Sequence, residues 1–122
     1  MRASKETADI RLRIMLAPGM PLGPGKAQLL QGIQETGSIS AAGRRMGMSY
    51  KRAWYLVEAL NSHFGAAMVE TTKGGKTGGG AKLTPLGTDV LAAYREMEGA
   101  TARAIGPILR RLRRKAGPAT AG

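Results

Sequence analysis

The sequence predicts a mainly α-helical fold with a small β-hairpin wing: a winged helix-turn-helix followed by a long C-terminal dimerisation helix. Two short helical segments meet at a tight glycine turn, Gly47-Met48. Two strand-like segments flank a glycine-rich tip at residues 72–80, and a long amphipathic pattern begins at Thr84. A helix pair followed by a basic hairpin is the arrangement that places the second helix in the major groove of DNA.

The composition limits the chain to one domain, or one domain with an appendage, because it has 122 residues. Nineteen Lys and Arg against eight Asp and Glu give a formal net charge of +11. This excess favours a polyanionic partner, either nucleic acid or an anionic membrane surface. The lack of cysteine excludes disulfides and thiolate metal sites, which fits a reducing cytoplasm. The sequence contains neither a secretion signal nor the roughly 20 consecutive apolar residues of a membrane span.

The DNA-binding domain is predicted at residues 10–83, after a flexible polar segment at residues 1–9. Residues 10–16 alternate apolar side chains with Arg11 and Arg13, which predicts a half-buried strand. The next segment, residues 17–25, contains three prolines and three glycines, so we expect a loop there.

A first helix is predicted from Lys26 to Gly37. Its apolar residues recur at helical spacing, at Leu29, Leu30 and Ile33. Gly37 is a favourable C-terminal stop, because glycine adopts the left-handed conformation that ends many helices.

The helix-turn-helix pair is predicted next. Its first helix begins at a serine cap, Ser38 or Ser40, and Gly47-Met48 makes the tight turn to the second helix. Ser49 can cap that second helix, which we expect over residues 50–65. The inward-facing residues of the pair are Ile39, Ala42, Met46, Ala53, Val57 and Leu60.

The start of the second helix carries side chains suited to reading DNA: Tyr50, Lys51, Arg52 and Tyr55. Lys51 and Arg52 can reach guanine acceptors or phosphates, although on their own they also fit an ordinary solvated helix face. Ser49 can reach a phosphate, and Tyr50 a base or a sugar. Ser38 and Ser40 complete the candidate DNA contacts outside the wing. Trp54, the single tryptophan, fits core packing and a place near DNA equally well.

The glycine-rich tip, residues 72–80, joins two predicted strands at 67–71 and 81–84. Gly75-Lys76-Thr77 resembles the end of a phosphate-binding P-loop, but Glu70 stands where that loop needs a glycine. Further glycines follow in place of a helix. The wing of a DNA-binding domain is the better interpretation, because glycines let the backbone approach DNA closely. Lys73 and Lys76 would neutralise phosphates, and Thr77 lies beside them in the sequence.

A long last helix is predicted at residues 84–115, with Thr84 as its cap and Pro85 at its first position. Its apolar face recurs at steps of three and four: Val90, Tyr94, Met97, Thr101, Ile105, Ile108 and Leu112. This face is longer than one small core can cover, which favours a dimer interface. Gly106-Pro107 predicts a kink or a break.

The end of this helix carries a basic cluster, Arg110–Lys115. The cluster is equally compatible with a patch that binds DNA or a membrane surface and with a solvated last turn favoured by the helix dipole. The following residues, 116–122, are expected to be disordered.

Two segments together carry a family resemblance. They are ETGSISAAGRRMGMSYKRAWYLVEALN and KGGKTGGGAKLTPLG, and their most specific parts are GSIS, SYKRAW and the Gly-Gly-Lys-x-Gly-Gly-Gly wing followed by Leu-Thr-x-x-Gly. From about Lys26 to Tyr94, the chain resembles the N-terminal DNA-binding domain of the ModE-type molybdate-responsive regulators. That domain is itself similar to the LysR-type winged helix-turn-helix.

The resemblance implies a homodimer joined largely through the first and last helices, with recognition helices in successive major grooves. The residues that we assign to this interface are Leu30, Val90, Tyr94, Met97, Thr101 and Ile105. The family's DNA-reading segment falls on residues 49–52 with Trp54 or Tyr55, and its wing falls on residues 72–80. Full-length members also carry C-terminal molybdate-binding domains. No such segment follows in this sequence, so we do not expect molybdate binding by this chain alone.

The leading hypothesis is a homodimeric, sequence-specific transcriptional regulator that binds double-stranded DNA in the cytoplasm, at the bacterial nucleoid. One alternative is a non-specific architectural DNA-binding protein, and another is a DNA-binding subunit of a sensor partner. We expect no membrane partner, no cofactor and no enzyme activity, because the acidic residues show no paired spacing for acid–base chemistry. We also expect no metal site: His63 is the single histidine, cysteine is absent, and a surface position near a helix end is expected for it.

Overall fold

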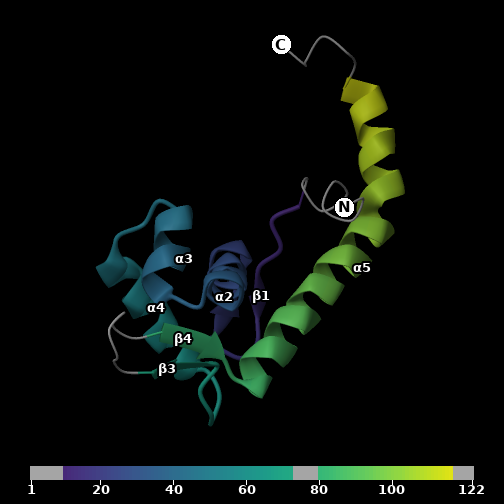
Figure 1. The fold of residues 1–122 in the computed structure, drawn as a ribbon. Coiled ribbons are helices and arrows are strands. Elements are labelled where there is room, and N and C mark those ends of the chain that lie inside the picture. Colours follow the sequence, from purple (N-terminus) through teal and green to yellow (C-terminus); the bar gives the residue numbers. More distant parts are fainter. Residues whose placement is uncertain (1–9, 73–79, 117–122) are drawn as a thin grey trace. The chain divides into compact units, whose positions relative to one another are not determined.

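The computed structural model describes residues 10–72 and 80–116 (Figure 1). Along the chain, the elements are β1 (Ile14–Met15), β2 (Pro21–Leu22), α2 (Pro24–Thr36), α3 (Ile39–Arg45), α4 (Tyr50–Asn61), β3 (Val69–Thr72), β4 (Gly80–Leu83) and α5 (Pro85–Ala116). This order confirms the predicted fold class. The chain divides into two compact units, one of which is Leu12–Tyr94. The described residues 10–11 and 95–116 belong to the other unit.

The N-terminal segment forms a short hairpin where the sequence predicted one longer strand and a loop. β1 pairs antiparallel with β2 over two residues each, so the strand prediction for residues 10–16 was wrong in its length. The loop prediction for residues 17–25 missed β2 and the first turn of α2. Proline is tolerated in an edge strand and at the first position of a helix, as at Pro21 and Pro24. The predicted alternation nevertheless holds, because Arg11 and Arg13 are exposed between partly buried apolar residues.

Helices α2, α3 and α4 pack closely because a glycine, which has no side chain, lies at each of the two helix contacts. A Cβ added at Gly32 of α2 would lie 2.9 Å from the Cβ of Ala42 on α3. A Cβ added at Gly43 of α3 would lie 3.0 Å from the Cβ of Ala53 on α4. A larger side chain at either glycine would therefore force neighbouring helices apart.

The core of the Leu12–Tyr94 unit is mainly aliphatic. Its largest fully buried side chains are Tyr94, Leu22, Leu29, Leu30, Ile33, Leu60, Met68 and Val57. The one aromatic ring among them belongs to Tyr94, whose hydroxyl donates a hydrogen bond to the carbonyl oxygen of Leu12 at 2.7 Å. This bond satisfies the hydroxyl group in otherwise apolar surroundings and fixes the N-terminal segment to α5.

Asn61 joins the end of α4 to the wing. Its Oδ1 accepts hydrogen bonds from the N–H groups of Met68 at 2.8 Å and Val69 at 3.0 Å, and its Nδ2 donates to the Val69 carbonyl at 3.1 Å. α4 ends at Asn61, so the prediction of a helix to residue 65 was wrong. The physical reason is that an asparagine side chain competes with the helix for backbone partners, and here it pairs with a strand instead.

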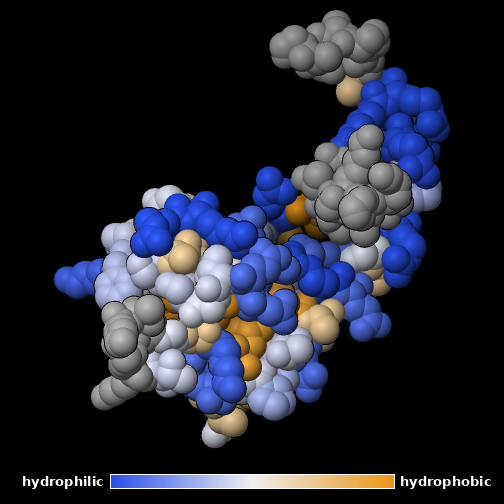
Figure 2. Space-filling model, viewed as in Figure 1, coloured by the Kyte–Doolittle hydropathy of each residue, from blue (hydrophilic) through white to orange (hydrophobic). Residues whose placement is uncertain are grey.

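α5 runs without interruption from Pro85 to Ala116, so the break considered at Gly106-Pro107 does not occur. Proline inside a helix costs about 3 kcal/mol, which a helix of 32 residues can absorb. The predicted cap is confirmed, because Thr84 Oγ1 accepts a hydrogen bond from the N–H of Gly87 at 3.0 Å. The last turns of α5 present a strongly hydrophilic surface (Figure 2). None of the described helices is both long enough and apolar enough to span a membrane.

Lys26 and His63 form a polar contact between α2 and the segment after α4. Lys26 Nζ donates to the Pro21 carbonyl at 3.0 Å and lies 3.4 Å from His63 Nε2. Partial burial and the charge of Arg13 lower the pKa of Lys26. Partial burial and then the Lys26 charge lower the pKa of His63, while a hydrogen bond to the Pro21 backbone acts in the opposite direction. The neutral ring is therefore the form that suits the folded chain.

We predict that Gly87→Ala destabilises the protein by about 1–3 kcal/mol, although alanine usually favours a helix by about 1 kcal/mol over glycine. The new Cβ would overlap the carbonyl oxygen of Met68, which already accepts from the N–H of Thr84 at 2.9 Å. Gly99→Ala is the control, because its Cβ would meet only the movable guanidinium end of Arg103 at 3.4 Å. Urea unfolding of both variants measures the difference, and a stabilised Gly87→Ala protein would contradict the packing described here.

We also predict that stability falls as the pH drops through about 6.5, the ordinary pKa of histidine. The pKa of His63 is lower in the folded chain than in the unfolded chain. Acidification therefore protonates the unfolded chain first and favours it, whereas above this range the ring is neutral in both states. Melting temperatures of the wild type and His63→Gln, measured between about pH 5.5 and pH 7.5, should show a smaller decline for the variant. Equal declines would rule out His63 as the source.

Candidate nucleic-acid interface

The turn between α3 and α4 depends on one left-handed glycine and one shared carbonyl acceptor. Gly47 has a φ of 70°, a conformation that side chains rarely adopt. The Gly43 carbonyl accepts hydrogen bonds from the N–H groups of Met46 and Met48, each at 3.0 Å. The predicted tight turn at Gly47-Met48 is therefore confirmed, and it fixes the direction in which α4 starts.

Serine side chains cap both helices of the pair. Ser38 Oγ accepts from the N–H of Ala41, and Ser49 Oγ accepts from the N–H of Arg52, both at 3.0 Å. Of the two caps considered for the first helix, the structure thus selects Ser38. Ser40 has a different role, since its Oγ accepts a hydrogen bond from Arg44 Nη1 at 3.0 Å. Each hydroxyl can still donate its own hydrogen, so a phosphate contact remains chemically open to all three serines.

The structure brings four of the candidate DNA-binding residues together on the exposed face of the first two turns of α4. They are Tyr50, Lys51, Arg52 and Tyr55. Tyr50 is 58% exposed and Tyr55 is 60% exposed. Exposed aromatic side chains beside cations suit a partner that offers both flat bases and phosphates.

Aromatic contacts hold this face in place. The Arg52 guanidinium lies 5.5 Å from the centre of the Tyr55 ring, within the range of a cation–π contact. The rings of Tyr50 and Trp54 meet edge to face, with centroids 6.2 Å apart. Trp54 is partly buried and packs against the core, so its contact with Tyr50 connects the exposed face of α4 to the core. Spacing of i,i+3 and i,i+4 along one helix could have indicated both pairs.

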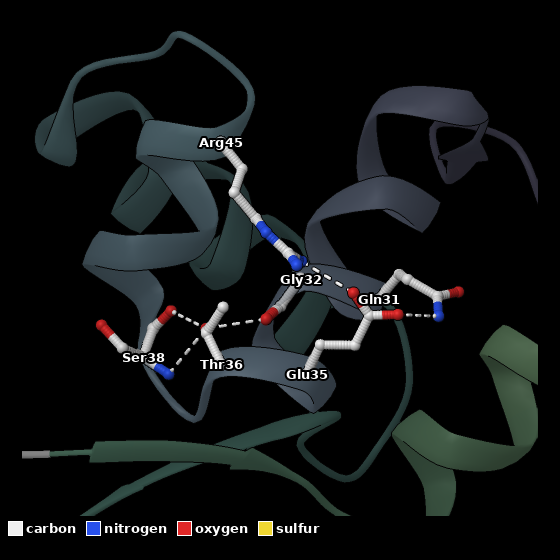
Figure 3. A network of polar contacts seen from close by, with 6 residues as sticks. All are labelled: Gln31, Gly32, Glu35, Thr36, Ser38 and Arg45. Carbon is white, nitrogen blue, oxygen red and sulfur yellow. Dashed lines mark hydrogen bonds and ion pairs between the residues drawn. The ribbon is translucent and has the colours of Figure 1, made fainter.

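A polar network joins α2 to α3 (Figure 3). Glu35 accepts from Gln31 Nε2 and from Arg45 Nη1, each at 2.7 Å. Thr36 Oγ1 donates to the Gly32 carbonyl at 2.7 Å and accepts from the N–H of Ser38 at 3.2 Å. The network was missed from the sequence, because Arg45 and Glu35 stand ten positions apart and meet only across two helices.

The wing is attached to the helices at the point where α2 ends. β3 pairs antiparallel with β4, from Val69 opposite Leu83 to Thr72 opposite Gly80. The N–H of Ala81 donates to the Gly37 carbonyl at 2.9 Å. The end of the hairpin next to its tip is thereby joined to the residue that ends α2. Three candidate DNA contacts at its tip, Lys73, Lys76 and Thr77, lie outside the described residues.

The residues assigned to dimerisation are in different environments. Leu30 and Tyr94 are 0% exposed within this chain, so we no longer assign their side chains to a partner. The reason is that the first helix and the start of α5 use these residues for the chain's own core. Val90 is partly buried and packs against the same core. Met97, Thr101 and Ile105 are partly exposed in the second unit. Ile108 and Leu112 of the same apolar face are 46% and 57% exposed.

Two residues near the interface were missed from the sequence. Asn61 carries the link to β3, and its signal was its place at the end of an amphipathic helix. Arg44 is exposed in the last turn of α3 and carries a positive charge. The adjacent pair Arg44-Arg45 was visible in the sequence as a basic helix end.

Comparison with known proteins places the similarity on this interface. The model of the family described as bacterial regulatory helix-turn-helix protein, lysR family, matches residues 26–88. The chain is 47% identical over 85 residues to the molybdenum-pterin-binding protein MopB of Rhodobacter capsulatus, which covers 70% of this chain and 32% of MopB. It is 46% identical over 70 residues to the molybdenum transport protein ModE of Herbaspirillum seropedicae, covering 57% of this chain and 26% of that protein.

A third relative carries a description of function in its name. The chain is 37% identical over 87 residues to the DNA-binding transcriptional dual regulator ModE of Escherichia coli K12, covering 71% of this chain and 33% of that protein. The chain therefore spans only about a third of the length of these curated relatives, or less. The family model's match, residues 26–88, contains most of α2, all of α3 and α4, both strands of the wing and the first turn of α5.

Proposed function

Because the chain belongs to the lysR family of bacterial regulatory helix-turn-helix proteins, we propose that it is a sequence-specific DNA-binding transcriptional regulator. The observation that carries the proposal is the exposed face of α4, on which Lys51 and Arg52 lie between two exposed tyrosines. The ModE relatives named as transcriptional regulators share this region. The molybdenum-related names of other relatives are not transferred, because the match covers about a third of their length or less.

In the proposed complex, α4 enters the major groove with its N-terminal turns facing the bases. Arg52 would form paired hydrogen bonds to a guanine, the commonest specific contact of this kind. Tyr55 would hold the Arg52 guanidinium over its ring before DNA binds. Arg52 would therefore lose less side-chain entropy on binding. Lys51 and the serine hydroxyls would contact phosphates and set the register. This assignment gives the protein a regulatory role at the nucleoid and no catalytic one.

The test is selection of bound sequences from a random duplex pool at physiological salt. We expect enrichment of a two-fold-related motif whose half-sites are about 10 base pairs apart, or a multiple of this. Arg52→Ala should weaken binding to the selected site by about 1–3 kcal/mol and relax the preference at one base position. Arg13→Ala, which removes an exposed arginine just before β1, is the matched control. Retention of the pool without enrichment would instead indicate a non-specific architectural protein.

We further propose that the second unit joins two copies of the chain through the apolar face of α5. The members of this face that lie outside the chain's own core are Met97, Thr101, Ile105, Ile108 and Leu112. Their steps of four, four, three and four are those of a helix that pairs with another helix. The exposure of Ile108 and Leu112 supports the proposal, because two large aliphatic side chains in successive turns gain stability from a partner.

We predict that Ile108→Asp shifts the protein from dimer to monomer, because it would place a carboxylate in the apolar contact without a partner. Ala92→Asp is the control: Ala92 is exposed and lies about 160° around the helix from Ile108 at 100° per residue. Sedimentation equilibrium of the wild type and both variants gives the masses. A monomeric wild type, or a dimeric Ile108→Asp protein, would contradict the proposed interface. If the wild-type chain is monomeric alone and associates only with a separate sensor protein, the result supports the alternative that the chain is a DNA-binding subunit.

A further inference from the structure

The last turns of α5 combine many positive charges with no acidic residue. After Glu98 the sequence contains neither Asp nor Glu. Its cations in this region are Arg103, Arg110, Arg111, Arg113, Arg114 and Lys115, and all of them are exposed. In Figure 2, the visible surface of the last turns of α5 is mostly hydrophilic. Six cations within thirteen residues raise the question of what anion they serve.

The helix itself does not account for these charges. Its dipole favours cations only in the last turn, which here contains Arg113, Arg114 and Lys115. Arg103 lies three turns earlier, and Arg110 precedes the last turn as well. Like charges three and four positions apart destabilise a helix by a few tenths of a kcal/mol per pair. Repulsion among these side chains therefore opposes the helix and does not explain why they are there.

Two of these arginines are held against the helix in the same way. A Cβ added at Gly99 would lie 3.4 Å from Arg103 Nη1, and a Cβ added at Gly106 would lie 3.5 Å from Arg110 Nη1. Each guanidinium thus lies over a glycine four positions earlier, and the pattern repeats after seven residues. Seven residues are about two turns, so both guanidinium groups are on one side of α5, about 10 Å apart along the axis.

The same side of α5 contains a cavity of about 280 Å³ within the second unit. Its lining includes Arg103, Arg110 and Arg113, together with Ile10, Gly106 and Leu109. We call Arg103, Arg110 and Arg113 the arginine face. Arg103 and Arg110 point away from the apolar face that contains Ile108, since they lie about 140° and 160° from it around the helix at 100° per residue. Pairing through the apolar face would therefore leave the arginine face open.

We propose that the arginine face is a second, sequence-independent DNA-binding surface that contacts backbone phosphates. The inference rests on the proposed binding of DNA by α4. Arginine is suited to phosphate because its planar fork donates two parallel hydrogen bonds, and five of the six cations here are arginines. A membrane surface is less well matched, because interfacial helices commonly carry aromatic anchors and residues 95–116 contain no aromatic residue.

The proposal has a measurable consequence for salt dependence. Each phosphate that a protein neutralises on double-stranded DNA adds about 0.9 to the steepness of log K against log salt. Arg103→Gln/Arg110→Gln should therefore reduce the steepness by about 2 per chain while leaving the selected sequence motif unchanged. The matched control is Arg11→Gln/Arg13→Gln, which removes the same charge from exposed positions near the N-terminus. The control should change the steepness by much less.

The experiment measures binding of the full-length chain to one duplex that contains the selected motif, over a series of salt concentrations. Circular dichroism verifies that both double variants retain the helical content of the wild type. Unchanged steepness for Arg103→Gln/Arg110→Gln would overturn the proposal, and so would an equal reduction in both double variants, which would reflect net charge alone. Loss of vesicle binding in the arginine variant, with phosphatidylserine vesicles as probe and DNA binding unaltered, would assign the face to membranes instead. Failure of the wild type to bind any duplex would reject the proposed function itself, a result distinct from these.

Discussion

The close packing of α3 against both of its neighbours is the constraint on which the rest of the structure depends. α3 has only seven residues, too few to form a stable helix in isolation. It is held because Gly32 and Gly43 let it approach α2 and α4 to the contact distance of Cβ atoms. The carbonyl of Gly43 is also the acceptor that closes the turn into α4. The direction of the candidate reading helix thus follows from two positions that lack a side chain.

Polar links extend this arrangement to the wing. Asn61 binds the start of β3 through three hydrogen bonds, and the N–H of Ala81 binds the carbonyl of Gly37. The base of the wing is therefore fixed to the end of α4, and the part of β4 next to the tip is fixed to the residue that ends α2. A binding surface assembled on rigid elements loses less conformational entropy when a partner binds. The smaller entropy loss matters most for the exposed aromatic and basic side chains of α4. Their contacts with one another restrict them further.

Local chemistry made most of the fold predictable from the sequence. Serine caps, the glycine turn and helical spacing act within a few residues, so they were identified directly. The exceptions involve residues distant in the chain: β2 forms only because β1 lies opposite, and α4 ends early because Asn61 meets β3. The face of α4 was predictable because its polar side is contiguous. Periodicity could not separate Tyr94, which the chain buries itself, from Ile108, which it leaves exposed, because both continue one apolar pattern.

α5 therefore has three parts: apolar residues buried in the chain's own core, an exposed apolar face, and a basic end. The proposed dimerisation and DNA binding by these parts would affect each other. Up to Tyr94, α5 completes a core, and from Met97 onward the same spacing continues in partly exposed or exposed side chains, the face that we propose for a second copy. If two such helices pair in parallel, their arginine-rich ends lie near each other, and like charges repel. Phosphates bound at these ends would remove the repulsion. Since a ligand that favours the paired state strengthens pairing to the same extent, DNA binding and dimerisation should stabilise each other.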